Sequence, residues 1–169
     1  HIKFSNVANM LATGSFDGTV RLWNIEDASC LATLSNGNKG QIHSFDIYKD
    51  SSIIAMASKD KKIHTFDPRS QEAITSFDSF TGAKSAKITF LPKYGWILGC
   101  GFDKSAKRQI RIWDLRDLSK TIYSQNLDSA ASILVPRWDD DLGVLYTMGK
   151  GEGTISYYEI VNDATKVYY

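Results

Sequence analysis

The sequence lacks the features that identify several large classes of protein. It has no apolar run approaching the roughly 18 residues that a membrane-spanning helix needs. Its formal net charge at neutral pH is +1, so no overall field draws it toward nucleic acid or an acidic membrane. We therefore expect no membrane span and no nucleic-acid partner. Any partner recognised by charge must be recognised by local patches.

Cysteine is also scarce. Cys30 and Cys100 are the only two, and each lies in an apolar stretch rather than at the spacing of metal ligands or a redox pair. We expect both to be small core residues. The chain begins with His1 rather than methionine and carries no secretory leader, which predicts a piece of a longer intracellular protein.

The groups that catalysis or metal binding would need are not arranged for it. No serine or cysteine has an identifiable base and orienting partner. His43 and His64 have no ligand constellation around them, and Asp139 to Asp141 lack the alternating spacing of a calcium loop. GKGEGT at 149–154 joins two strand-like runs, which favours a hairpin turn over a phosphate cradle. We expect no metal, no cofactor and no enzymatic activity.

What the sequence does contain is a repeat. Four segments align: LATGSFD with TVRLWNI, IAMASKD with KIHTFDP, ILGCGFD with QIRIWDL, and LYTMGKGE with TISYYEI. Their aromatic residues Trp23, Phe66, Trp113 and Tyr158 recur at intervals of 43, 47 and 45 residues. This period is typical of a β-propeller blade.

Each repeat divides into four short strand-like runs separated by polar turns, as in IHSFDIY, IIAMAS, KIHTFD and AITSF. The runs are apolar on both faces, which is expected where neighbouring sheets cover each other. The sequence predicts an all-β propeller segment of about four blades, each of four antiparallel strands. The blades are expected at roughly residues 1–34, 42–80, 86–128 and 132–169.

The aromatic residue of each repeat is expected to fill the space between sheets. Its indole N–H, where the residue is Trp23, needs an acceptor. We expect Ser15 and Asp17 in the nearby turn to form this network, with Ser58 and Asp60 repeating it. Gly101 replaces the hydroxyl in the third repeat and predicts a thinner network there. The structural repeat positions are Ser15, Asp17, Trp23, Ser58, Asp60, Phe66, Asp103, Trp113 and Tyr158.

These hairpins resemble the WD-repeat family, and among the four matched aromatic positions one is a true Trp-Asp pair, at 113–114. Within that family the chain is similar to the coronins, which are actin-filament-binding propellers. The resemblance is carried by SKDKKIHTFDPRS, GFDKSAKRQIRIWDLRDL and ILVPRWDDDLGVLYTMGKGEGTISYYEI, within residues 58–70, 99–118 and 133–160. It implies a seven-bladed propeller of which this chain is a part, and a cytoplasmic protein of the actin cytoskeleton.

Function is expected in the loops, because propeller strands are committed to packing. The turns between the second and third strand of each blade share a face with the connections between blades. That face is expected to be basic and to bind acidic actin filaments. Its candidate contact residues are Lys59, Lys61, Lys62, Lys104, Lys107, Arg108 and Lys150, together with Lys39.

Two alternatives stay open at this point. A single turn lysine can simply keep a β-rich surface soluble. The whole chain can also belong to a generic WD-repeat scaffold or substrate-receptor adaptor rather than to a cytoskeletal protein. The coronin resemblance further implies a contact with the complex that nucleates branched filaments, through regions outside this chain.

Overall fold

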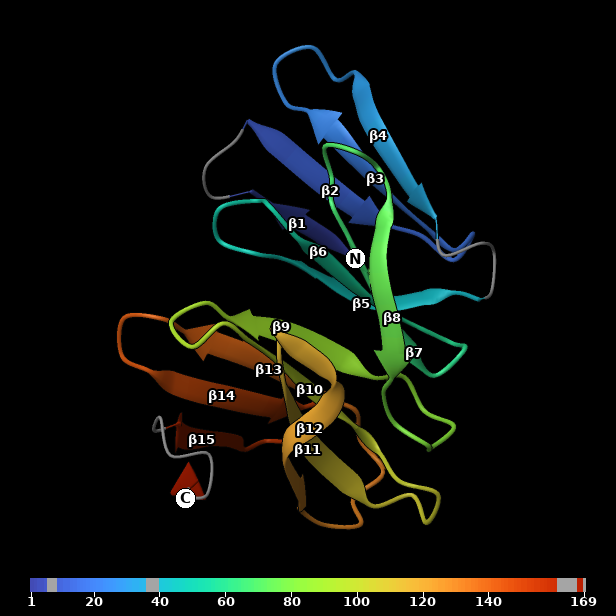
Figure 1. The fold of residues 1–169 in the computed structure, drawn as a ribbon. Helices are drawn as coiled ribbons and strands as arrows, with labels where there is room; N and C mark the ends of the chain where they lie inside the picture. Colours follow the sequence, from blue (N-terminus) through green and yellow to red (C-terminus); the bar gives the residue numbers. More distant parts are fainter. Residues whose placement is uncertain (6–8, 36–39, 161–166, 169) are drawn as a thin grey trace. The chain divides into compact units, whose positions relative to one another are not determined.

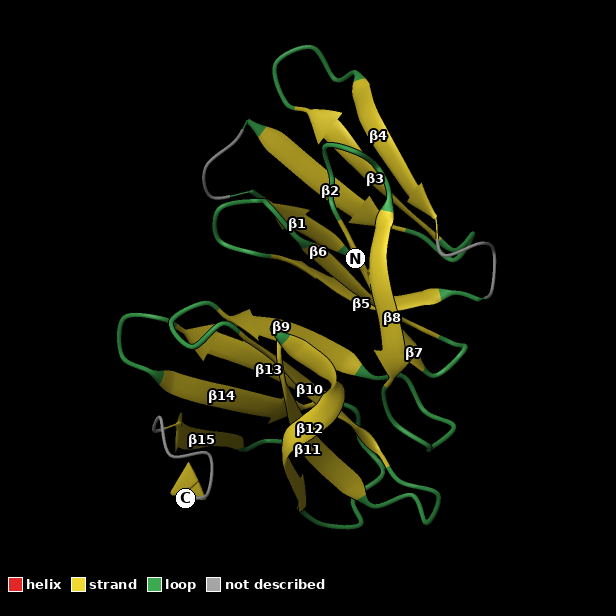
Figure 2. Ribbon diagram, viewed as in Figure 1, coloured by secondary structure: helices red, strands yellow, loops and turns green. Residues whose placement is uncertain are grey.

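The structure of the chain is a computed structural model, and it describes residues 1–5, 9–35, 40–160 and 167–168. In these ranges the regular structure is all β-strand, without a helix (Figure 2). The strands form four antiparallel sheets, each of four strands. The prediction of an all-β fold built from four-stranded antiparallel units is confirmed.

The first two sheets are simple meanders. Strands that follow each other along the chain are neighbours in the sheet, because antiparallel strands can be joined by short turns (Figure 1). The first sheet contains β1 (Ile2–Phe4), β2 (Met10–Gly14), β3 (Thr19–Asn24) and β4 (Cys30–Ser35). The second contains β5 (Ile42–Ile47), β6 (Ile54–Ser58), β7 (Lys62–Phe66) and β8 (Ala73–Asp78).

The third and fourth sheets have the same strand order. The third contains β9 (Lys87–Leu91), β10 (Trp96–Phe102), β11 (Arg108–Asp114) and β12 (Asp117–Asn126). The fourth contains β13 (Leu134–Asp139), β14 (Val144–Gly149), β15 (Ile155–Ile160) and β16 (Val167–Tyr168).

The chain forms two compact units, residues 1–79 and 80–169, with two sheets in each. In the first unit, Val20 and Leu22 are buried on β3 while their immediate neighbours are less so, as the two-residue period of a strand requires. They share one apolar core with Phe45 and Met56 of the second sheet. The two sheets of this unit therefore pack face to face.

The second unit has an equivalent core. Strand β10 is buried along its whole length, as expected of a strand covered on both faces. Leu98 and Cys100 of β10 pack in one cluster with Leu145 and Tyr158 of the fourth sheet. Burial raises the pKa of the Cys100 thiol to about 12, so Cys100 is inert at neutral pH.

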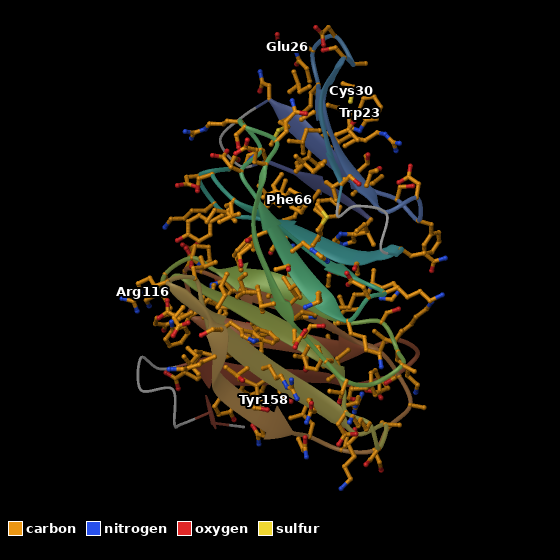
Figure 3. All side chains as sticks on the ribbon, turned by 45° about the vertical axis from the view of Figure 1, so that its right-hand side comes forward. Trp23, Glu26, Cys30, Phe66, Arg116 and Tyr158 are labelled. Carbon is orange, nitrogen blue, oxygen red and sulfur yellow. The ribbon has the colours of Figure 1, made fainter. Side chains whose placement is uncertain are left out.

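The first sheet has a second face, turned away from the core of its unit. Trp23 pairs across the strands with Cys30 on this face, and the two lie together in Figure 3. Trp23 is only half-buried, Cys30 is exposed, and Phe4 on the same face is 62% exposed. The expectation of a core position for Cys30 is therefore wrong. Strict alternation would put Cys30 on the same face as Ala32. A register shift between Leu22 and Trp23 instead pairs Ala32 with Leu22 and Cys30 with Trp23, which leaves Cys30 on the uncovered face.

Candidate interaction surface

In the first unit, the turn between the second and third strand meets the connection that joins neighbouring sheets. The Lys59 N–H donates to the Gln41 carbonyl at 2.9 Å. The Ser79 N–H donates to the Lys61 carbonyl, also at 2.9 Å. The β6–β7 turn is thus held against both flanking connections.

The second unit repeats this arrangement. The Gly82 N–H donates to the Phe102 carbonyl at 2.8 Å, and the Lys150 N–H donates to the Ile133 carbonyl at 3.0 Å. Within each unit, these hydrogen bonds place the candidate lysine turns beside the inter-sheet connections.

Asp17 organises the β2–β3 turn. Its carboxylate accepts hydrogen bonds from the Thr19 N–H at 3.0 Å, from the Thr19 hydroxyl at 2.6 Å and from Arg21 Nη2 at 2.8 Å. The bonds from Thr19 and then Arg21 lower the pKa of Asp17 below its usual range. This carboxylate is therefore ionised at neutral pH and occupied by its own turn.

Asp60 has the same role in the β6–β7 turn. It accepts hydrogen bonds from the Ser58 hydroxyl and from the Lys62 N–H at 3.0 Å, and it lies 2.8 Å from His64 Nε2. Burial raises the pKa of Asp60, but the bonds from Ser58, Lys62 and His64 together lower it further than burial raises it. His64 stands four residues after Asp60, as Arg21 stands four residues after Asp17.

The β10–β11 turn is longer, and Asp103 accepts from the Lys107 N–H at 2.8 Å. Gly101 stands where the first two repeats have a serine hydroxyl, and it has a steric role. A Cβ at Gly101 would lie 2.2 Å from Phe80 Cγ, so this glycine makes room for the aromatic ring. Phe80 was not singled out from the sequence. The pair of glycines at 99 and 101 in an apolar strand was the available signal for a bulky neighbour.

Trp23 does not use the turn network expected for it. Its indole Nε1–H donates to the Thr13 hydroxyl at 2.8 Å. Thr13 lies on β2, while Ser15 instead accepts from the Asp17 N–H at 3.3 Å. The prediction that Ser15 and Asp17 accept this hydrogen bond is therefore wrong, and the acceptor is Thr13. Of the other repeat aromatics, Phe66, Trp113 and Tyr158 are all buried.

The candidate lysines differ in what surrounds them. Lys62 Nζ forms an ion pair with Asp78 at 3.0 Å. Lys61 is exposed and has a φ of 66°, at the turn position where Gly18 has a φ of 83°. Among the candidate lysines, those that are exposed and form no ion pair within the described part of the chain are Lys59, Lys104, Lys107 and Lys150. Lys39 lies outside the described residues.

Arg108 does not belong to the exposed set. It is 7% exposed, and its Nε and Nη2 bind the Asp128 carboxylate at 2.6 and 2.5 Å. Its Nη1 donates to the Ser132 hydroxyl at 2.9 Å and to Glu152 at 2.8 Å. Arg108 is therefore buried, whereas the sequence predicted it on the exposed basic face. The connection between β12 and β13 folds back over Arg108 and supplies its partners Asp128 and Ser132. No pattern in the sequence near Arg108 predicts this contact.

The rest of the described chain offers no metal site and no membrane-spanning helix. Among its residues, no group of three or more His, Cys, Asp and Glu side chains is placed to hold a metal ion. No helix within the same ranges has the length and apolar character to cross a membrane. Arg116 in the β11–β12 turn points away from its sheet in Figure 3 and pairs with Asp114 at 2.6 Å.

Comparison with known proteins shows which family this fold resembles. The family model "WD domain, G-beta repeat" matches residues 1–24. The crystal structure of the WD40 domain from Toxoplasma gondii coronin superposes with a TM-score of 0.91 and 28% identity, over 99% of this chain and 43% of that one. The coronin-like protein crn1 of Schizosaccharomyces pombe is 36% identical over 157 residues, which are 92% of this chain and 26% of that protein. The chain is a WD-repeat segment of the coronin type.

Other coronins show a similar degree of likeness. Coronin-2A of Homo sapiens is 30% identical over 167 residues, covering 96% of this chain and 31% of that protein. The coronin-like protein of Saccharomyces cerevisiae is 33% identical over 166 residues, which are 25% of its length. This coronin-type segment therefore spans about a quarter to a third of the curated relatives it matches. Its four sheets are those of a WD-repeat β-propeller.

Proposed function

We propose that the protein is a non-catalytic, actin-filament-binding module of the cytoplasmic actin cytoskeleton, and that lysines of its turns contact the filament. One observation carries this proposal. The turn carboxylates Asp17, Asp60 and Asp103 are occupied by hydrogen bonds within their own turns. In the β6–β7 and β10–β11 turns, the exposed lysines outnumber Asp60 and Asp103, so the outward charge of these two turns is positive; these lysines are Lys59, Lys61, Lys104 and Lys107.

A positive surface of this kind suits an acidic filament. Complementary charge increases the rate of encounter and orients the partner, and its effect weakens as salt screens it. The proposed contact residues are Lys59, Lys61 and Lys62 in the first unit, and Lys104, Lys107 and Lys150 in the second. A contact with the complex that nucleates branched filaments would use regions of the relatives that this chain does not span.

Co-sedimentation of the full-length protein with filamentous actin across a salt series tests the proposal. We expect the protein to pellet with filaments at low salt and to be released as salt rises. The double variant Lys59→Glu and Lys104→Glu should bind about tenfold more weakly. The matched control is Arg69→Glu with Lys120→Glu, two exposed residues outside these turns.

Three results would count against this reading. A folded protein that stays in the supernatant at every salt concentration would rule out filament binding and favour the WD-repeat adaptor. Equal losses in the test and control variants would remove the lysine turns from the contact. Binding unaffected by either double variant would do the same.

A further inference from the structure

The turn between β10 and β11 carries a serine between two of the proposed contact lysines. It consists of residues 103–107 and is longer than the β6–β7 turn at 59–61. Lys104, Ser105 and Lys107 are all exposed. Neither lysine forms an ion pair within the described part of the chain. A change of charge at Ser105 would therefore act directly on the charge that this turn presents to a partner.

The base of the turn is closed by Asp103 and Lys107. The Asp103 N–H donates to the Lys107 carbonyl at 2.9 Å, and the Lys107 N–H donates to the Asp103 carboxylate at 2.8 Å. The Ala106 N–H donates to the Asp103 carbonyl at 3.1 Å. None of these bonds uses Lys104 or Ser105. The side chain of Ser105 can therefore be modified without breaking the hydrogen bonds that close the turn.

The serines of the two equivalent turns in the first unit are engaged, whereas Ser105 is not. Ser15 accepts from the Asp17 N–H at 3.3 Å, and the buried Ser58 donates its hydroxyl to Asp60. Ser105 makes no hydrogen bond to any residue that the structure describes. Its hydroxyl is therefore open to a reacting partner from outside.

The positive charge of the β10–β11 turn is small enough to be reversed by one modification. Lys104 and Lys107 outnumber Asp103, and Arg108, the next residue, is buried and paired with Asp128. A phosphoryl group on Ser105 would add a charge of about −1.5 to −2 at neutral pH, which more than cancels this excess. Its oxygens can also accept charge-assisted hydrogen bonds from ammonium groups of the same turn.

We propose that Ser105 is a phosphorylation site and that its phosphorylation releases the protein from the filament. The modifying enzyme is a serine kinase that selects basic residues on both sides of the serine through acidic groups of its own. The inference rests on the proposed filament contact and concerns its regulation.

The reaction is a phosphoryl transfer from ATP. Ser105 Oγ attacks the γ-phosphorus, so a bond forms between these two atoms. The bond between that phosphorus and the oxygen bridging it to the β-phosphorus breaks, and ADP leaves. The hydroxyl proton passes to a base of the kinase.

Phosphoserine introduced at position 105 of the full-length protein by genetic-code expansion tests the effect on binding. We expect binding to filamentous actin in co-sedimentation at low salt to be about tenfold weaker than that of the parent protein. The difference should shrink as salt rises, because salt screens the charges that cause it. Phosphoserine at position 70 is the matched control, since Ser70 is an exposed serine of the β7–β8 turn, outside the lysine turns.

Two substitutions separate charge from size. Ser105→Glu adds a negative charge and should weaken filament binding about threefold or more. Ser105→Gln adds a side chain of the same size without the charge and should stay within about twofold of the parent protein. Thermal unfolding of both variants checks that the fold is retained.

Access of a kinase to Ser105 is tested without actin. The full-length protein is incubated with ATP and an extract of the cells that produce it, and its peptides are analysed by mass spectrometry. We expect phosphate on Ser105, and its loss from that peptide in Ser105→Ala.

The proposal is overturned if the protein with phosphoserine at position 105 pellets as well as the parent, or if phosphoserine at position 70 weakens binding equally. It is also overturned if Ser105→Gln loses as much binding as Ser105→Glu, or if the extract adds no phosphate to Ser105. A parent protein that never pellets would reject the filament contact and this regulation with it. Failure of the regulation alone leaves the parent pelleting, so the two failures are distinguishable.

Discussion

The ring of Phe80 stands edge-on to the indole of Trp113, with ring centroids 5.9 Å apart and planes at 89°. This geometry is favourable for aromatic pairs, because the positive ring edge meets the negative face. Gly99 and Gly101 provide the space, since a Cβ at either position would meet the Phe80 ring within 3 Å. The segment that enters the third sheet is thereby anchored on β10 and β11.

This packing predicts that Gly101→Ala is destabilising. The added methyl group would force Phe80 to move, and we expect the free energy of unfolding to fall by about 1–3 kcal/mol in urea denaturation. Gly153→Ala is the control, because a Cβ there meets nothing within 4 Å. A second change, Phe80→Leu, should make Gly101→Ala less costly than it is alone. Equal stability of the two alanine variants would contradict the packing argument.

The hydrogen bond from Trp23 to Thr13 predicts a measurable coupling between them. Thr13→Val removes the acceptor of the indole N–H and should cost about 0.5–1.5 kcal/mol. In a double-mutant cycle with Trp23→Phe, most of this cost should disappear, because the donor is then absent as well. Thr121→Val, at an exposed position on β12, serves as control. Additive losses would mean that the bond contributes nothing to stability.

The hydrogen-bonded ion pair between Arg108 and Asp128 predicts that the stability of the fold depends on pH. The hydrogen bonds from Arg108 lower the pKa of Asp128, so the folded state holds this carboxylate ionised more firmly than the unfolded chain does. The resulting stabilisation is present above the ordinary carboxyl pKa of about 4, and it is lost as pH falls through the lowered value. We expect Arg108→Gln to lower the free energy of unfolding by about 2 kcal/mol at neutral pH.

Unfolding measured over a series of pH values distinguishes the ionic contribution of Arg108 from a general loss of stability. As pH falls through the lowered pKa of Asp128, the curves of the parent protein and Arg108→Gln should converge, because Asp128 becomes protonated in both. Lys107→Gln changes the adjacent exposed residue and should stay within about 0.5 kcal/mol of the parent at every pH. A constant difference between Arg108→Gln and the parent down to low pH would contradict an ionic origin.

The backbone of Lys61 predicts which substitutions its turn accepts. A φ of 66° is costly for a residue with a side chain and natural for glycine. Lys61→Gly should therefore leave the stability unchanged or raise it by up to about 1 kcal/mol, measured by thermal unfolding. Lys61→Val should lower it by about 1–2 kcal/mol, because a β-branched residue is strained there. If both variants lose stability equally, the turn is not governed by this dihedral angle.

The repeat and the strands could be read from the sequence because both are local patterns. The spacing of Trp23, Phe66, Trp113 and Tyr158 set the period, and the two-residue alternation on strands such as β3 set the inward face. The hydrogen bonding of Asp17 and Asp60 is also local, since most of their partners lie within four residues. These features need no knowledge of which sheet lies against which.

Tertiary structure decided everything that depends on distant partners. Arg108 reads as a turn residue, yet Asp128 and Glu152, which are 20 and 44 residues away, bury it. Cys30 and Cys100 both occupy apolar stretches, but only Cys100 lies on a strand covered on both faces. A surface cavity beside β9, β13 and β14 likewise exists only because two edge strands meet. Periodicity sets the direction of a side chain, whereas its burial is set by what packs against it.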